Sequence, residues 1–283
     1  LDTKGILFMT DSLLASGDKG EIKEGLVGKG YFPQVQLNNY SLKWWPKADS
    51  MVITTSKNNF NFYNATANLE GSLVLRSAGL FGNGTLRRRD SEAISKSIKF
   101  NKEGFVADNA QFKVISDKDA NRPMLLGKGL TVDFNQTKGI VGLAINQNTT
   151  IDDTLGGASM EFPFAAYKTN INRAQWNINA KTIAMKGDVK SSTFTATAEE
   201  QEGLTFNGSA AVYDVEKMML NISGVPYVTS ADARIYPDKG LVAVRRNGEM
   251  LPLKNAKLEL DTINLFHRLK NGNIQVLSRT KFA

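Results

Sequence analysis

The stretch AQWNINAKTIAM, residues 174–185, carries the pattern that decides the fold of this chain. One alternating run ends on an aromatic residue, an Asn begins a short polar segment, and a second alternating run follows. Alternating runs separated by three to five turn residues are typical of β-hairpins. The same phrase occurs six times, so the sequence predicts at least six hairpins. The paired runs are Leu42–Pro46 with Met51–Ile53, Ile98–Asn101 with Phe105–Val106, Leu130–Asn135 with Ile140–Val141, Ala174–Asn177 with Ile183–Met185, Ala211–Asp214 with Met219–Ile222, and Ala233–Pro237 with Leu241–Val244.

The composition also favours strands joined by polar turns over long helices. The 283 residues include 24 Gly, 25 Asn and 20 Thr against 7 Pro, a balance that supplies turn and strand residues. Hydrophobic residues make up 41% of the chain, which is enough for a sizeable core. We therefore expect a mostly β protein of stacked antiparallel hairpins, forming an open β-jellyroll or elongated sheet with few short helices.

Helix signals are weak, and so are the signals for domain breaks. The best helix candidates are Asp261–Lys270, which also fits a strand, and Ser12–Glu24, which two glycines interrupt. The best breaks are Leu80–Gly84 and Gln147–Gly157. Within what we expect to be an excerpt of a longer chain, the predicted parts are an N-terminal extension with a short helix at 1–40, a β lobe at 41–150 and a second β lobe at 151–283.

The absence of cysteine and the presence of one histidine exclude several classes of chemistry. Disulfides, Cys-ligated zinc, iron–sulfur clusters and thiol nucleophiles all need cysteine, and His267 alone cannot form a site that needs two imidazoles. A long uncharged stretch such as residues 139–151 is still far shorter than the roughly 18–20 apolar residues of a membrane-spanning helix. We predict no cofactor and no bound metal.

Five acidic residues are candidates for the paired carboxylates of glycoside hydrolysis, because separation in space rather than in sequence defines that chemistry. All of them lie in polar, turn-like stretches, which favours solvated loop acids as the competing interpretation: Asp152, Asp153, Glu161, Glu199 and Glu200. The pair at 152 and 153 lacks the residues that complete a calcium-binding loop. A carbohydrate-active enzyme is therefore the third of three functional hypotheses.

The chain is basic, with 35 Lys and Arg against 28 Asp and Glu and a net charge of +7. Arg87–Arg89 and Arg245–Arg246 are local clusters, whereas most lysines are scattered through turns. No stretch convincingly interleaves aromatic with basic residues, so a nucleic-acid partner is not predicted. Contact with anionic lipid headgroups or with an acidic partner is an alternative use of this charge.

The aromatic-rich segment Phe32–Tyr63 is a candidate partner surface, with core packing as the competing interpretation. If Trp44 and Trp45 share a strand, they point to opposite faces, and one of them lies at an interface or under a loop. The residues assigned to the partner surface are Trp44, Trp45, Phe60, Phe62, Arg87, Arg88 and Arg89.

Two resemblances to known families rest on these motifs. The hairpin phrase resembles the strand repeats of the OstA-like periplasmic family, the lipopolysaccharide-transport bridge proteins, at Phe100, Phe134, Trp176, Tyr213 and Tyr236. The stretch VPYVTSADARIYPDKG, residues 225–240, followed by LKNAK, residues 253–257, resembles a phrase of very large envelope proteins of Bacteroidota. The resemblances imply a grooved β-jellyroll and an association with the type IX secretion translocon, as the subunit that plugs its periplasmic opening.

One further motif agrees with export. Bacteroidota O-glycosylate exported proteins at Asp-Ser/Thr-apolar triplets, and composition alone predicts about one such triplet. The chain has four, which makes Ser12, Ser50, Thr154 and Thr262 candidate glycosylation sites.

These expectations combine into one functional hypothesis. The chain is expected to be a non-enzymatic protein of the periplasm, associated with the outer membrane, that docks on or plugs an outer-membrane protein-export translocon. Its partners are expected to be the β-barrel of that translocon or other envelope subunits, contacted through strand edges, loops and exposed aromatics. The alternative is an OstA-like module that transfers lipid or lipopolysaccharide. Lipid transfer predicts an open apolar groove, whereas a plug predicts a filled core and a docking patch.

Overall fold

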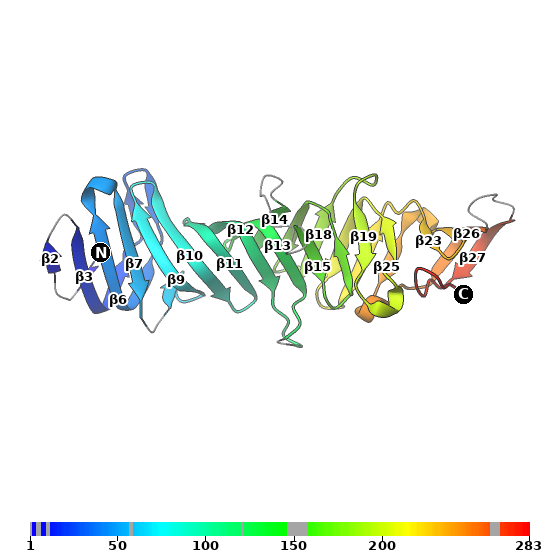
Figure 1. Cartoon of the computed structure of the whole chain (residues 1–283), viewed down its shortest axis with the longest axis horizontal. Coiled ribbons are helices and arrows are strands. Elements are labelled where there is room, and N and C mark those ends of the chain that lie inside the picture. The colour runs from blue at the N-terminus through cyan, green and yellow to red at the C-terminus, as the bar shows by residue number, and fades with distance from the viewer. Residues whose placement is uncertain are drawn as a thin grey trace. The chain divides into compact units, whose positions relative to one another are not determined.

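The computed structural model describes residues 2–3, 7–9, 12–56, 59–119, 121–145, 158–260 and 267–283. Over these ranges the chain is mostly β-structure, with antiparallel strands joined by short turns (Figure 1). The prediction of a mostly β protein built from antiparallel hairpins is confirmed. The helical elements in these ranges are 3₁₀ turns of three residues: η1 Pro46–Ala48, η3 Glu199–Gln201, η4 Asp238–Gly240 and η5 Arg246–Gly248.

The chain divides into two compact units. Unit 1 holds residues 1–115 and 129–138, and unit 2 holds residues 116–128 and 139–283. Strand β13 (Leu125–Asn135) therefore contributes residues to both units. This division differs from the predicted lobes at 41–150 and 151–283.

The N-terminal region is part of unit 1 and is not helical where a helix was expected. Residues 13–22 of the candidate helix Ser12–Glu24 form strand β3 (Leu13–Ile22), which pairs along its length with β6 (Val35–Trp45). Two glycines in this stretch disfavour a helix, and pairing with a long neighbouring strand satisfies the backbone instead. Within the expected extension at 1–40, Leu13–Ile22 and the first part of β6 are thus paired in a sheet.

Unit 1 is built on an antiparallel sheet whose strands follow one another in chain order. Strands β1 and β2 pair with β3, β3 with β6, and β6 with both β7 and β8, which also pair with β9. Strands β10, β11 and β12 then follow β9. The bounds are β1 Asp2–Thr3, β2 Leu7–Met9, β7 Ser50–Thr55, β8 Phe60–Phe62, β9 Ala67–Arg76, β10 Gly79–Arg88, β11 Ser91–Phe100 and β12 Gly104–Val114, with a separate hairpin of β4 Gly25–Val27 and β5 Gly30–Phe32.

A buried ladder explains why the register of this sheet is fixed. Side chains alternate between the two faces of a strand, so register partners share a face. The partners from β3 to β12 are all buried: Ala15, Leu42, Ile53, Leu73, Gly82, Ile98 and Ala107. A slip of one residue would bring the side chains of the opposite face of that strand into this ladder.

The stretch Leu80–Gly84 was predicted to be a break, and this prediction is wrong because it lies inside β10. Gly84 is the register partner of Gly71 on β9. A Cβ atom on Gly71 would lie 1.9 Å from the carbonyl oxygen of Asn83. Glycine inside a strand often marks such a close backbone approach, so here it permits pairing rather than ending it.

Unit 2 contains two rows of antiparallel strands. Row A pairs β13 (through Leu126–Lys128) with β15, then β16, β19 and β20. Row B pairs β14 with β17, then β18, β21, β22 and β25. The bounds are β15 Ser159–Phe162, β16 Tyr167–Thr169, β19 Thr193–Ala196 and β20 Thr205–Asn207 in row A, and β14 Ile140–Ile145, β17 Arg173–Asn177, β18 Thr182–Lys186, β21 Ala210–Asp214, β22 Met219–Ser223 and β25 Val242–Val244 in row B.

Successive hairpins alternate between the two rows. The hairpins β15–β16 and β19–β20 belong to row A, and β17–β18 and β21–β22 belong to row B. The buried side chains of both rows fill one interior, where the ring centroids of Phe162 (row A) and Tyr213 (row B) are 4.9 Å apart. Both rings are fully buried.

A C-terminal sheet completes unit 2, in the order β23 Val228–Ser230, β24 Ala233–Tyr236, β26 Leu253–Leu260 and β27 His267–Ile274. The sixth predicted hairpin, Ala233–Pro237 with Leu241–Val244, is wrong. Its first run is β24 of the C-terminal sheet, whereas its second run is β25, which pairs with β22 of row B. The alternating pattern identified both strands but not their partners.

The other predicted hairpins form as expected where their pairing is described. Four of them are β6–β7, β11–β12, β17–β18 and β21–β22. Both strands of the run at 130–141, β13 and β14, are also present. The Asx residue after the aromatic opens the turn: the Oδ1 of Asn177 accepts the N–H of Ala180, and the Oδ1 of Asp214 accepts that of Lys217, both at 2.9 Å.

Two remaining predictions fall wholly or partly outside the described residues. The break at Gln147–Gly157 does so entirely. In the helix candidate Asp261–Lys270, residues 261–266 lie outside the described residues, and the last four residues belong to strand β27.

Candidate binding surface

The two tryptophans predicted for a partner surface lie at the end of β6, on opposite faces as expected. Trp44 shares its face with its register partners Leu13 and Met51, and 39% of it is exposed. Trp45 is half-buried on the other face, where the Lys43 ammonium lies 5.0 Å from its ring centroid. Trp44 is thus the more accessible of the two rings.

Phe60 and Phe62 were also assigned to that surface, and this assignment is wrong. Both side chains are fully buried, because β8 lies between β6 and β9 and its alternate residues face the core. The ring of Phe62 stacks on Phe100 with centroids 4.1 Å apart. These rings stabilise unit 1 and cannot contact a partner.

The arginines Arg87–Arg89 are only partly available to a partner. Arg87 forms ion pairs with Glu70 and Glu92, and the hydrogen bond that its guanidinium donates to Glu70 raises the pKa of Arg87. Arg88 is half-buried, pairs with Asp90 at 3.3 Å and lies 4.5 Å from the ring centroid of Phe134. Arg89 is exposed at the end of the strand.

The second arginine cluster is largely engaged within unit 2. Arg245 forms an ion pair with Glu249, which raises the pKa of Arg245 and lowers that of Glu249. The guanidinium of Arg246 lies 5.5 Å from the ring centroid of the buried Phe164. Most arginines of the two clusters therefore contact side chains of their own unit, and they are only partly available to a partner.

The candidate glycosylation sites are described in two of four cases. Ser50 begins β7 and is half-buried. The carboxylate before it, Asp49, accepts both the backbone N–H and the hydroxyl of Ser77, which lowers the pKa of Asp49. Ser12 is half-buried just before β3. Thr154 and Thr262 lie outside the described residues.

The candidate catalytic acids do not line either of the two pockets described below. Glu161 lies on β15 with register partners Leu126 and Lys168, and Glu199 and Glu200 are exposed in η3. Asp152 and Asp153 lie outside the described residues. His267 is exposed at the start of β27. In the described part of the chain, acidic and imidazole side chains form no group of three that could hold a metal ion.

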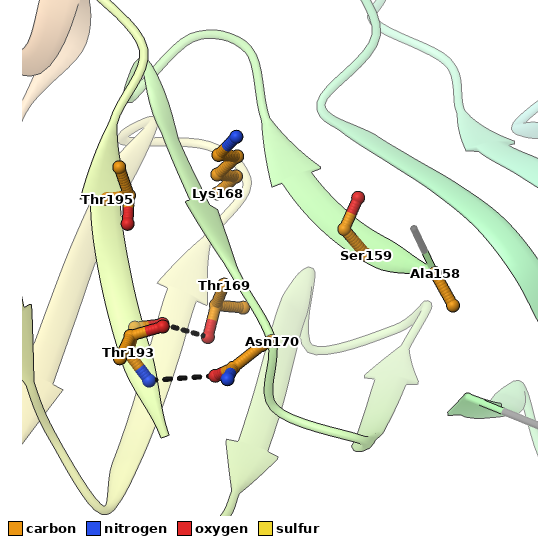
Figure 2. A pocket seen from close by; sticks show the side chains of 7 residues that line it. All are labelled: Ala158, Ser159, Lys168, Thr169, Asn170, Thr193 and Thr195. Carbon is orange, nitrogen blue, oxygen red and sulfur yellow. Dashed lines mark hydrogen bonds between the residues drawn. The ribbon is translucent and has the colours of Figure 1, made fainter. Parts of the chain in front are cut away.

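A first depression, of about 250 Å³, lies on the outward face of row A (Figure 2). Its polar groups largely bond to one another. The Thr169 hydroxyl donates to the carbonyl of Thr193, and the Thr193 N–H donates to the Oδ1 of Asn170, each at 2.8 Å. The Thr195 hydroxyl shares a 3.0 Å hydrogen bond with Thr205. Apart from Lys168, this depression offers few unused groups to a ligand.

A larger depression of about 530 Å³ lies where β20 of row A meets β23 of the C-terminal sheet. Tyr227, which is 40% exposed, is one of the residues that line it. The lining residues are Val189, Lys190, Thr205, Phe206, Asn207, Pro226, Tyr227 and Thr229. Residues that carry hydroxyl, amide, ammonium and aromatic groups thus line one concave surface, which we call the Tyr227 pocket.

The outward face of the C-terminal sheet continues this surface with aromatic and basic side chains. The guanidinium of Arg234 lies 5.4 Å from the ring centroid of Tyr227, and the rings of Tyr227 and Tyr236 are 5.9 Å apart. Glu259 accepts the Tyr236 hydroxyl at 2.6 Å, which raises the pKa of Tyr236. Glu259 also pairs with Arg268 at 3.3 Å, so this carboxylate is already neutralised.

The sequence did not predict this surface, although its signal is present. Thr229 on β23 and Tyr227 just before this strand are two residues apart, and Arg234 and Tyr236 alternate on β24, so all four lie on the outward side. Lys190 and Thr205 come from other elements, and no local pattern shows that β20 and β23 are neighbours. The expectation that no strand face interleaves aromatic and basic residues is therefore corrected here.

Comparisons with protein-family models, with curated proteins and with solved structures found no match to this chain. In the described ranges, the helical elements are too short to cross a membrane.

Proposed function

We propose that this chain is a non-enzymatic protein of the periplasm that docks on, or plugs, the periplasmic side of an outer-membrane protein-export translocon of the type IX kind. Its partners are the outer-membrane barrel of that translocon or associated envelope subunits. A plug acts by steric occlusion, so it needs a solid body and an accessible contact patch rather than a reactive centre.

The observation that carries this proposal is the filled interior of unit 2. Phe162 and Tyr213 meet between rows A and B, and the neighbouring rings Tyr167, Phe194 and Phe206 are also buried. A module that carries acyl chains needs unoccupied apolar volume between its strands. Aromatic side chains occupy that volume here, which favours a rigid docking body over lipid transfer.

Trp44 supplies a candidate contact for docking. Exposed aromatic residues are enriched at the centres of protein interfaces, because a single ring buries a large apolar area. Leu13 and Met51, the register partners of Trp44, are half-buried and extend the apolar row to either side of it. Arg89 is the part of the predicted basic cluster that stays open to an acidic partner or to anionic headgroups.

The test is affinity purification of the tagged chain from native envelopes, with mass spectrometry of both protein and lipid in the eluate. We expect an outer-membrane barrel protein to co-purify in stoichiometric amount, with lipid well below one molecule per chain. Stoichiometric lipid without a protein partner would instead favour lipid transfer and would refute the docking proposal.

A further inference from the structure

The Tyr227 pocket has the composition of a ligand site. Tyr227 lies in the segment between β22 and β23 and is 40% exposed. Such a ring offers a flat apolar face at the wall of a concave surface. The guanidinium of Arg234 lies against this ring and projects positive charge over the same region.

Basic side chains gather around the pocket. Within the described part of the chain, no carboxylate forms an ion pair with Lys190, Arg234 or Lys257. Lys190 lines the pocket itself, and Lys257 is the register partner of Tyr236. The neighbouring acids have other partners: Asp188 accepts the backbone N–H of Lys190 at 2.9 Å, and Glu259, the register partner of Arg234, pairs with Arg268 at 3.3 Å. The local field therefore favours an anion.

The remaining lining groups suit a ligand with many hydroxyls. Among the described residues, neither the Thr229 hydroxyl nor the Tyr227 hydroxyl has a hydrogen-bond partner, although the Thr229 backbone belongs to the β23–β24 ladder. The amide of Asn207 donates to the carbonyl of Val189 at 2.9 Å, which leaves its own carbonyl oxygen as an acceptor. Donors and acceptors at the rim of an aromatic face are the groups that recognise a sugar ring.

We propose that the Tyr227 pocket binds an acidic saccharide, one that carries carboxylate groups on its sugar rings. A sugar ring stacks on Tyr227, its carboxylate pairs with Arg234 or Lys190, and its hydroxyls bond to Thr229 and Asn207. Guanidinium groups match the planar carboxylate with two parallel hydrogen bonds. This binding activity goes beyond the proposed docking function and does not depend on it.

The arrangement favours a saccharide over a nucleic acid. Single strands bind along a track of exposed rings on which successive bases stack. Here Tyr227 is the exposed ring, whereas Tyr236 is half-buried and its hydroxyl is held by Glu259. The neighbouring outward positions of row A carry Thr195 and Thr205 rather than aromatic residues.

The experiment is calorimetric titration of the full chain with a short oligogalacturonate, at low and at moderate salt. We expect Tyr227→Ala to weaken binding about tenfold, the upper range for loss of one stacking ring. Lys190→Gln should also weaken it, whereas Tyr227→Phe, which keeps the ring, should retain most of the affinity. The matched control is Lys186→Gln, an equal loss of charge at an exposed position on β18 of row B, which should leave the affinity unchanged.

Three outcomes would overturn the proposal. The first is no binding, or equal binding of a neutral dextran oligomer. The second is an equal loss of affinity in Lys186→Gln, which would mean a diffuse charge effect. The third is tighter binding of oligodeoxythymidylate or of phosphatidylglycerol vesicles at the same residues. Circular dichroism checks the fold of each variant, and if Tyr227→Ala misfolds, Lys190→Gln and Thr229→Val carry the test.

Discussion

Gly71 and Gly84 are the residues on which the pairing of β9 and β10 depends most directly. They are register partners, and the carbonyl group that precedes each glycine occupies the space that the other's Cβ would need: a Cβ on Gly84 would lie 2.1 Å from the carbonyl oxygen of Glu70. The two backbones approach each other more closely here than any side chain permits. The glycines therefore act on the sheet geometry rather than on chain flexibility.

We expect Gly71→Ala to destabilise unit 1 by about 1–3 kcal/mol, because a methyl group there overlaps the Asn83 backbone. Gly25→Ala is the matched control, since Gly25 has a similar φ of +158° against +155° but no atom within 4 Å of its Cβ position. Urea unfolding followed by tryptophan fluorescence measures both changes in free energy. Equal losses of stability in the two variants would show that the φ angle, and not the close backbone approach, excludes a side chain at residue 71.

Trp44 and Trp176 offer a residue-scale test of the docking surface. Trp44→Ala should cost less than about 1 kcal/mol of stability, because the ring is already 39% exposed. If the proposed docking function holds, it should nevertheless abolish co-purification of the proposed barrel partner. Trp176→Ala removes a ring that is only 4% exposed and should cost about 3–5 kcal/mol. Undiminished co-purification with Trp44→Ala would exclude this residue from the contact.

At the scale of elements, the C-terminal segment is held in place by the turn η3. The Glu202 carboxylate accepts the Ser278 hydroxyl at 2.9 Å, the Thr280 N–H at 3.2 Å and the Thr280 hydroxyl. These bonds lower the pKa of Glu202, with the Thr280 side chain contributing most. Gln201 adds a further bond, from its amide to the carbonyl of Leu277.

This attachment should weaken in acid. Because the pKa of Glu202 is lower in the folded protein, its contribution is present above the ordinary value of 4.5 and is lost as the pH falls through the folded value. We expect hydrogen exchange at the Thr280 amide to accelerate below pH 4.5 relative to the core of unit 2. Glu202→Gln should remove that pH dependence, whereas Glu200→Gln, in the same turn, should preserve it. A wild-type profile without such acceleration would contradict this role of Glu202.

The sequence predicted individual strands better than their partners. The aromatic residue followed by Asx located the turns at Asn177 and Asp214, because that pattern acts within a few residues of the chain. It could not show that β24 and β25 join different sheets, since alternation identifies a buried face but not the neighbouring strand. For the same reason Phe60 and Phe62 were wrongly predicted to lie on the surface. No local sequence pattern indicated that β20 and β23 are neighbours near Tyr227.

At the scale of the whole unit, the packing of the interior distinguishes a solid docking body from a lipid carrier. In unit 2 the rings between rows A and B replace the space that a lipid carrier would need. We expect Phe162→Ala to destabilise unit 2 by about 3–5 kcal/mol, since it removes a fully buried ring that contacts Tyr213. Thermal or urea unfolding measures this loss, with the exposed Lys168→Ala on the adjacent strand as a control near zero. A near-neutral Phe162→Ala would mean that the interior is loosely packed and would reopen the case for lipid binding.

Because hairpins alternate between rows A and B, such a protein can lengthen during evolution only by certain numbers of strands. Thr193, which starts β19, follows the start of β15 by 34 residues, and Ala210, which starts β21, follows the start of β17 by 37. Gain or loss of a single hairpin would transfer every later hairpin to the opposite row and change all of its neighbours. Duplication of two hairpins would leave each later strand in its own row, because in a stacked array each repeat contacts only its neighbours. Length variation in related chains should therefore come in steps of four strands.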